Sequence, residues 1–392
     1  MAQQHLDPTD PTAAQVTGDA LAGYLRTQAM EFLRALRLHR ETGGADPGRA
    51  RSRAGEHGAD ESVDAARALR RSARRISGSL HTFRPLLDVD WSERMRPELA
   101  WLSGTLALEH AYAARLDRLL TALHRLSGAT AFPAQSTGAA VGGRSAGAER
   151  VGTAEPGTAG PQSHPTPTTA NGAKEAPLNA PPPAERANLT VGAAKAGALL
   201  DRQLTLARTR AHSSALQALG SSRFHAVADS IAVLASEVPL TRAAPTTALH
   251  PLATAAEERL TDAVAALPLL TAGHPYNAEA LIHGLSPDPA PHPQDAPWHQ
   301  VRLLLRLHRY AREVLHGEDA VDVSLLSASQ ALDLHRDASE AAAAAASAAR
   351  TPRIAPATAY ALGVLHADQR HEVEAARFAF QRSWQKQTVG TS

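Results

Sequence analysis

The segment RALRRSARRISGSLHTF, residues 67–83, decides the fold class of this 392-residue chain. Residues three, four and seven positions apart share one face of an α-helix. Apolar residues recur at this spacing and form one face, made up of Ala66, Leu69, Ala73, Ile76, Leu80 and Phe83. The segment therefore predicts an amphipathic helix whose apolar face is buried in a helical core.

The opposite face of this helix is strongly basic. It consists of Arg67, Arg70, Arg71 and Arg74. Residues 65–87 contain no carboxylate, although the formal net charge of the whole chain is only +1. Like charges one turn apart destabilise an isolated helix by about 0.2–0.5 kcal/mol per pair. A bound anion would offset this repulsion, whereas a solvated charged face is the simpler alternative.

A second basic helix is predicted from PWHQVRLLLRLHRYAREVL, residues 297–315. Its basic face consists of His299, Arg302, Arg306 and Arg309. Laid over the first helix without gaps, the first three of these residues match Arg67, Arg70 and Arg74. The chain therefore has the pattern of an internal repeat of about 230 residues, with one basic helix in each copy.

The rest of the chain is also predicted to be helical. Alanine, leucine and arginine dominate, and all are good helix formers. Helices are expected at about residues 16–40, 61–83, 92–126, 189–219, 224–235, 248–267, 298–315, 325–349 and 355–384. No sustained alternation of β-branched residues favours a sheet. The predicted class is all-α.

Composition divides the chain into four parts. Residues 1–15 are expected to be a disordered tail, 16–126 a first helical bundle and 187–386 a second bundle. Residues 127–186 are Ala, Gly, Pro, Thr and Ser with hardly a large apolar residue, so they cannot bury enough surface to fold. We therefore expect two helical bundles in tandem, joined by a long disordered linker.

Several kinds of site and location are disfavoured. The absence of cysteine excludes disulfides and thiolate sites. No metal site is expected, because the histidines show no ligand spacing: His366 and His371, for example, diverge on a helix. No catalytic motif or cofactor-binding motif is found. Without a secretory signal or an apolar run of about 18 residues, the protein is expected to be soluble and cytoplasmic, with no membrane partner.

At this point the two basic helices resemble the signatures of a known family, the conserved histidine α-helical domain or CHAD. The second family pattern, H-x-x-R-x-x-x-K-R-x-R-Y, is similar to this chain at His299, Arg302, Arg309 and Tyr310, with Arg306 in the Lys position. The first, V-H-x-x-R-V-A-x-R-R-L-R, is matched by Arg70, Arg74 and Arg75. Arg67 stands where the family has its histidine.

Two further segments are similar to the family. ALDLHRDA, residues 331–338, contains His335 and Asp337 and looks like the L-G-x-H-x-D turn that follows the second signature. The last predicted helix looks like the family's closing helix. The resemblance implies two four-helix bundles related by a pseudo-two-fold axis, with the basic helices facing a central cavity.

The resemblance also implies a function. It predicts non-enzymatic binding of inorganic polyphosphate in the cytoplasm, with association with polyphosphate granules. The expected contacts are Arg67, Arg70, Arg71, Arg74, Arg75, His299, Arg302, Arg306, Arg309 and Tyr310. Additional candidates are Arg208, Arg210, Arg223 and His335. No catalytic residue, metal or cofactor is assigned.

The residue types suit this ligand, but other functions stay open. Polyphosphate has no base or sugar, so its recognition depends on cations, and the planar guanidinium of arginine donates to two oxygens at once. The same stripes could bind an RNA backbone, although they offer few exposed aromatics for stacking. A structural scaffold, with arginines paired to carboxylates of other helices, is a third reading. Hydrolysis of polyphosphate is disfavoured because no carboxylate cluster suits Mg²⁺.

Overall fold

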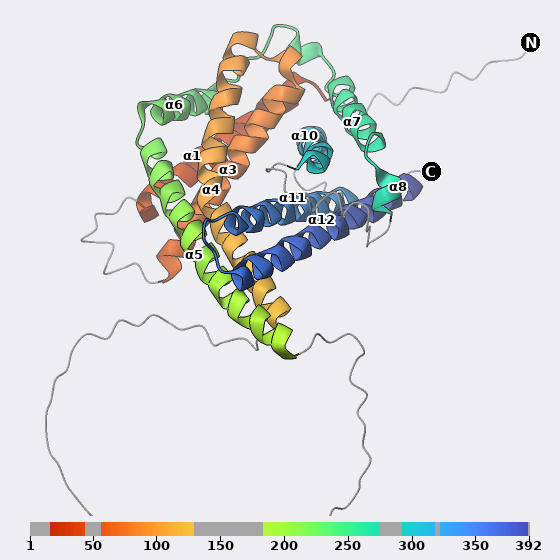
Figure 1. Ribbon diagram of the computed structural model, residues 1–392. Coiled ribbons are helices and arrows are strands. Elements are labelled where there is room, and N and C mark those ends of the chain that lie inside the picture. The colour runs from red at the N-terminus through yellow and green to blue at the C-terminus, as the bar shows by residue number, and fades with distance from the viewer. Residues whose placement is uncertain (1–15, 44–55, 129–182, 274–291, 318–321, 391–392) are drawn as a thin grey trace, which may run out of the picture.

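The computed structural model describes residues 16–43, 56–128, 183–273, 292–317 and 322–390 (Figure 1). Within these ranges the chain is built from helices, and no strand is present beyond two isolated bridges. The α-helices are α1 (Gly18–Gly43), α3 (Glu56–Thr82), α4 (Val89–Ser127), α5 (Pro183–Leu219), α6 (Ser222–Ser236), α7 (His250–Ala265), α8 (Leu269–Ala272), α10 (Ala296–His316), α11 (Val323–Ala349) and α12 (Pro356–Gly390). Short 3₁₀ helices are η1 (Arg84–Leu86), η2 (Ala244–Thr246) and η3 (Pro293–Asp295). The all-α prediction is confirmed.

The nine helices expected from periodicity are all present, and side-chain caps fix where several of them begin. The Asp88 carboxylate accepts a hydrogen bond from the backbone N–H of Trp91 at 2.7 Å, so α4 begins a few residues earlier than expected. Ser221 caps α6 in the same way, and Asp322 caps α11. The predicted tail and nearly all of the predicted linker lie outside the described residues. Among the described residues, no helix is long and apolar enough to cross a membrane.

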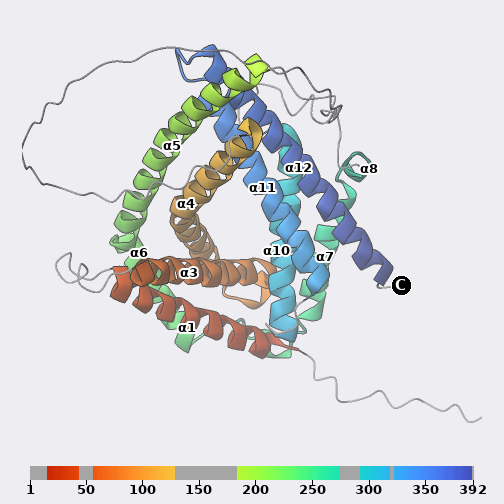
Figure 2. The ribbon, with the colours of Figure 1, turned by 90° about the horizontal axis from the view of Figure 1, so that it is seen from below.

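Three buried apolar clusters hold the helices together. The first joins α1, α3 and the beginning of α4 to α6, and contains Phe32, Phe83 and Phe224. The second joins the end of α4 to α5, α11 and the beginning of α12. The third joins α7, α10, α11 and the end of α12 around Trp298 and Phe380. In Figures 1 and 2, α4 and α5 lie side by side, and so do α11 and α12.

This packing bears on the expected division into two tandem bundles. Each cluster combines helices from different parts of the chain, and the first two combine helices from both sides of residues 129–182. Hydrophobic periodicity predicts which face of a helix is buried but not which helix covers it. The division at the linker and the pseudo-two-fold axis therefore stay predictions. The three apolar clusters are not built from helices that are consecutive in the sequence.

The basic helices α3 and α10 pack directly against each other, because Gly78 removes a side chain at their crossing. Gly78 is buried, and a Cβ built at this position would lie 2.6 Å from Cδ2 of Tyr310. It would also lie 3.4 Å from Cδ2 of Leu307. The close approach of the two helices thus requires glycine here. In Figures 1 and 2, α10 lies between α3 and α7.

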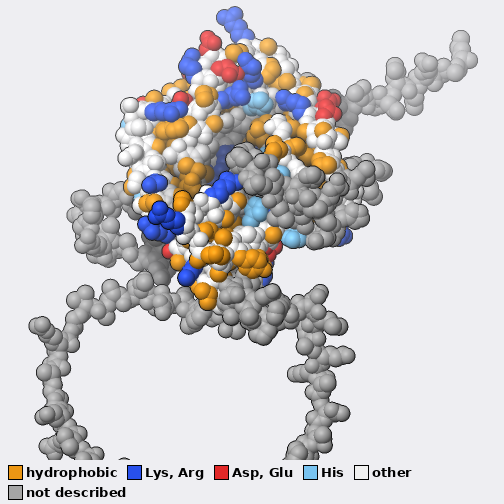
Figure 3. Space-filling model, in the orientation of Figure 1, with side chains coloured by type: hydrophobic (Ala, Val, Ile, Leu, Met, Phe, Trp, Pro, Cys, Tyr) orange, Lys and Arg blue, Asp and Glu red, His pale blue; other side chains and the backbone are white. Residues whose placement is uncertain are grey.

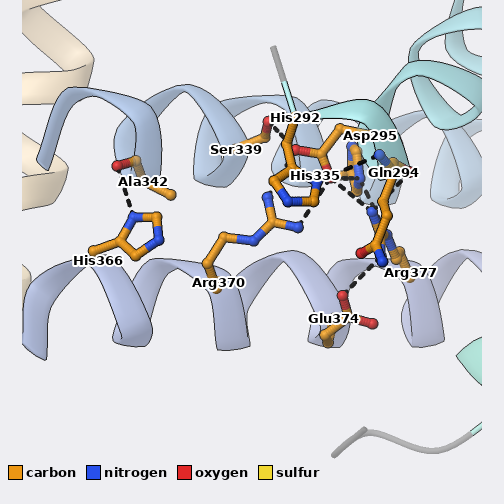
Figure 4. A network of polar contacts seen from close by, with 10 residues as sticks. All are labelled: His292, Gln294, Asp295, His335, Ser339, Ala342, His366, Arg370, Glu374 and Arg377. Carbon is orange, nitrogen blue, oxygen red and sulfur yellow. Dashed lines mark hydrogen bonds and ion pairs between the residues drawn. The ribbon is translucent and has the colours of Figure 1, made fainter. Parts of the chain in front are cut away.

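A buried polar network anchors the beginning of α10 (Figure 4). Asp295 is fully buried and accepts hydrogen bonds at 2.7 Å from Arg370 Nη1, Arg377 Nη2 and Ser339 Oγ. Burial by itself would raise the pKa of Asp295, but the hydrogen bond and the charge of Arg370 outweigh it and lower the pKa to about 2. The carboxylate stays ionised and ties α10 to α11 and α12.

His335 belongs to the same network. Its Nε2 accepts a hydrogen bond from Arg377 Nε at 3.3 Å, and its ring stacks on Trp298 with centroids 5.6 Å apart. The side chain is 1% exposed. Burial, together with the charge of Arg377, lowers the pKa of His335 to about 3. The imidazole is therefore neutral in the folded protein at physiological pH.

The buried histidine predicts a pH dependence of stability. In the unfolded chain a histidine gains a proton as the pH falls below about 6.5, whereas folded His335 stays neutral down to about pH 3. Its contribution to stability is thus complete above pH 6.5 and is lost as the pH falls, by up to about 1.4 kcal/mol per pH unit. Urea unfolding from pH 7 to pH 4.5 should show a shallower decline for His335→Gln than for the wild type. Parallel declines would contradict this assignment.

The crossing at Gly78 predicts a position-specific response to alanine. Gly78→Ala places a methyl group against Tyr310 and should destabilise the fold by about 1–3 kcal/mol, as overpacking does. Gly104→Ala is the matched control, since Gly104 also lies inside a helix but its Cβ would have nothing within 4 Å. That control should be neutral or slightly stabilising, because alanine favours helix. Equal effects of the two substitutions on the unfolding midpoint would argue against a tight crossing.

Candidate functional site

The structure brings arginines of α3 and α10 into one cluster. Arg70 and Arg74 come from α3, and Arg302 and Arg306 come from α10. Burial lowers the pKa of Arg306, and the positive charge of Arg74 on the facing helix lowers it further. The pKa of Arg70 is lowered by burial and by the charges of neighbouring arginines, Arg306 among them. The two basic faces are therefore close enough to repel each other.

A fifth arginine, Arg336 of α11, completes this group. We call Arg70, Arg74, Arg302, Arg306 and Arg336 the central arginine cluster. The charge of Arg336 lowers the pKa of each of the other four members. Arg336 itself is held by Asp337, whose carboxylate accepts from its Nη2 at 2.5 Å. Sequence reasoning missed Arg336, although it lies within the segment ALDLHRDA between the two residues considered there.

Three members of the cluster form no ion pair with a described residue. Among the described residues, no carboxylate lies within 4 Å of Arg70, Arg74 or Arg306. Burial, followed by the charge of Arg70, lowers the pKa of Arg74 to about 10. The Nε of Arg70 is buried and has no hydrogen-bond partner in the described part of the chain. Partly buried cations without partners are unfavourable, so this cluster is poised to bind an anion.

Two arginines of the basic faces, Arg302 and Arg67, are paired with carboxylates. Arg302 Nε donates to Asp333 of α11 at 2.5 Å. Arg67 is exposed and donates to Asp64 of its own helix at 2.9 Å, just before the carboxylate-free stretch begins. Arg71 is exposed and forms no ion pair with a described residue. The scaffold reading, in which carboxylates neutralise the stripes, therefore holds for part of the stripes only.

Arg75 connects the two basic helices. Its Nε donates to Glu313 Oε2 of α10 at 2.8 Å, and the hydroxyl of Tyr24 in α1 donates to the same oxygen at 2.9 Å. The side chains of Arg75 and Glu313 are 18% and 13% exposed, so the bridge is largely buried. This pairing fixes α3 against α10 and leaves Arg75 turned away from the central cluster toward α1.

The remaining α10 candidates lie around the cluster. Tyr310 is half-buried at the crossing beside Arg74 and Arg306, and burial raises the pKa of its hydroxyl. His299 is half-buried, with its ring edge against His335 at a centroid distance of 5.4 Å, and burial lowers its pKa. Arg309 donates to Ser329 Oγ of α11 at 3.1 Å and so packs between helices.

The additional candidates do not join the cluster. Arg208 lies 3.8 Å from a carboxylate oxygen of Glu109, and Arg223 donates to Glu98 at 2.6 Å, both on α4. Arg210 is exposed on α5. His335 is buried in the Asp295 network beneath His299. Arg208 and Arg223 therefore belong to the contacts of α4 with α5 and α6, and His335 packs against the ring of His299.

A cavity of about 220 Å³ lies beside the cluster, between α3, α4 and α11. Its polar lining consists of Arg70, His110, Arg115, Arg118, Arg336, Asp337 and Glu340. Arg70 and Arg336 belong both to this cavity and to the central cluster. Basic side chains are visible beside the hollow near the middle of the face in Figure 3. No group of three or more His, Cys, Asp or Glu side chains in the described ranges could hold a metal ion.

Comparison with known proteins identifies the family of this chain. The family model of the CHAD domain matches residues 45–346, a range that contains the whole central arginine cluster. The chain is also similar to the solved structure "PptA from Streptomyces chartreusis", with 64% sequence identity and a TM-score of 0.68. The similarity covers 94% of this chain and 99% of that one. No curated protein matches it. On the family model and this similarity, the chain belongs to the CHAD family.

Proposed function

We propose that this protein binds inorganic polyphosphate between α3 and α10, with the polymer seated on the central arginine cluster. One observation carries this proposal: Arg70, Arg74 and Arg306 converge from two facing helices without a carboxylate partner among the described residues. Membership of the CHAD family supports polyphosphate binding in general. The cluster supplies the positive charge that such a ligand neutralises.

The geometry of the cluster suits a linear polyanion. Arg70 and Arg74 are one helical turn apart, and so are Arg302 and Arg306 on the facing helix. One turn spans about 5.4 Å, so cations recur at regular intervals along a linear polyanion that follows the two helices. Each guanidinium can donate to two oxygens of a phosphate. Partial burial excludes water and strengthens these charge-assisted hydrogen bonds.

Further contacts extend along the same face. We assign Arg67 and His299 to the outer part of the path, with Tyr310 at the crossing of the two helices. Arg67 replaces the family's histidine with a permanent cation, so phosphate binding at this position does not depend on protonation. Arg75 and Arg309 stay outside the primary contacts, because both are used between helices. Arg71, which is exposed like Arg67, is assigned with it to the outer part of the path.

We propose binding without turnover, and association with polyphosphate granules through the same contacts. Family membership and the absence of a recognised catalytic motif in the sequence support the first part. The second part follows from the ligand, because a protein that holds the polymer along its length collects wherever the polymer accumulates.

Removal of two facing cations tests the site. The double variant Arg74→Gln, Arg306→Gln should lose on the order of 100-fold in affinity for long-chain polyphosphate, since each charge-assisted hydrogen bond contributes about 1.5–3 kcal/mol. Its affinity should also fall less steeply with salt, because fewer counterions are released. Isothermal titration calorimetry across a salt series measures both quantities.

A control variant with the same change in net charge makes this test specific. Arg208→Gln, Arg223→Gln removes two arginines that pair with α4 carboxylates away from the cluster, and it should bind polyphosphate nearly as the wild type does. Equal losses in the two double variants would show that only net charge matters. Displacement of polyphosphate by an equal phosphate concentration of single-stranded RNA would favour a general nucleic-acid binder instead.

A further inference from the structure

The cavity between α3, α4 and α11 is not explained by the path along α3 and α10. It opens beside that path and shares Arg70 and Arg336 with it. Two additional arginines, Arg115 and Arg118, come from α4, a helix outside both signatures. Four arginines and two carboxylates, Asp337 and Glu340, thus line a space of about 220 Å³, so the lining carries more positive than negative side chains.

The arginines of the cavity are held in place before a ligand binds. Glu340 forms an ion pair with Arg115 and lies 3.8 Å from Arg336 Nε. Arg118 Nε donates to Gln369 Oε1 of α12 at 2.6 Å. These contacts hold the arginine side chains in place and keep the entropy loss on binding small. The buried Nε of Arg70, which has no hydrogen-bond partner among the described residues, is a free donor at the same place.

The lining also contains hydrogen-bond acceptors. Asp337 and Glu340 face the cavity together with the arginines, and their side chains are 46% and 40% exposed. An internal phosphate of a polyphosphate chain has two free oxygens and one charge, and it carries no proton at neutral pH. A terminal phosphate has three free oxygens, up to two charges and a second ionisation near pH 6, so it can also donate a hydrogen bond.

We propose that this cavity is a subsite for the terminal phosphate of a linear polyphosphate, with Arg70, Arg115, Arg118 and Arg336 as donors and Asp337 or Glu340 as acceptor. The inference rests on the proposed function, because the rest of the polymer lies on the central arginine cluster. Clustered donors match the three free oxygens of the chain end. The protonated form of the chain end donates a hydrogen bond to Asp337 or Glu340, whereas an internal phosphate has no proton to donate.

Comparing a linear with a cyclic triphosphate tests whether the cavity recognises the end of the polymer or only its charge. Tripolyphosphate has two terminal phosphates, whereas trimetaphosphate is a ring of three phosphates and has none. Ala111→Leu on α4 fills the cavity without changing any charge, and it keeps a good helix former in place. It should weaken tripolyphosphate binding by on the order of tenfold, equivalent to about one charge-assisted hydrogen bond. Binding of trimetaphosphate should be unchanged.

Two other variants complete the experiment, with binding measured by calorimetry on the full chain. Arg115→Gln, Arg118→Gln should give the same selective loss for the linear ligand. Ala100→Leu places the same side chain on an exposed position of α4 outside the cavity and should change neither affinity. Thermal unfolding of each variant identifies any that fails to fold, and the other cavity variant then decides the test.

The outcomes distinguish the subsite from the proposed function. A selective loss of tripolyphosphate binding in the cavity variants supports the terminal subsite. Equal losses for the linear and cyclic ligands, or no loss for either, overturn it while wild-type binding of long-chain polyphosphate still supports the function. Failure of the wild type to bind long-chain polyphosphate overturns the function itself.

Discussion

The packing of α3 against α10 must hold positively charged side chains close to one another. Arg74 and Arg306 project from two helices that pack against each other, and among the described residues neither has a carboxylate within 4 Å. Partial burial increases their mutual repulsion, because fewer waters screen the charges. The apolar faces of the same helices must outweigh this repulsion, and Ile76, Leu80 and Leu305 are accordingly fully buried. The site therefore contains unfavourable electrostatic repulsion that the surrounding apolar packing outweighs.

Three features outside the cluster keep it assembled. Gly78 allows α10 to approach α3, and the pair between Arg75 and Glu313 fixes the two helices beside that crossing. At the other end of α10, Asp295 binds Arg370 and Arg377 and joins the helix to α11 and α12. Replacing one partner of such a buried pair is strongly destabilising. The buried charges that join the helices are thus paired, whereas Arg74 and Arg306, which we propose bind the ligand, have no carboxylate partner among the described residues.

The sequence predicted the helices and much of the central cluster for simple physical reasons. Helical periodicity places each apolar stripe, and the same spacing places Arg70 and Arg74 opposite it. The alignment of the two basic helices predicted the matching residues of α10. Arg336 was missed because one arginine in an ordinary helix makes no pattern. The pairing of Arg208 and Arg223 with α4 carboxylates was likewise invisible, since periodicity does not tell which helix covers a face.

A crystal structure of the full chain with long-chain polyphosphate would show where the polymer binds. We expect phosphates between α3 and α10, with oxygen atoms of one polymer within hydrogen-bond distance of Arg74 on one side and Arg306 on the other. A polymer bound along α5 and α6 at Arg208, Arg210 and Arg223, with the guanidinium groups of the central cluster free of phosphate, would rule out binding at the central cluster.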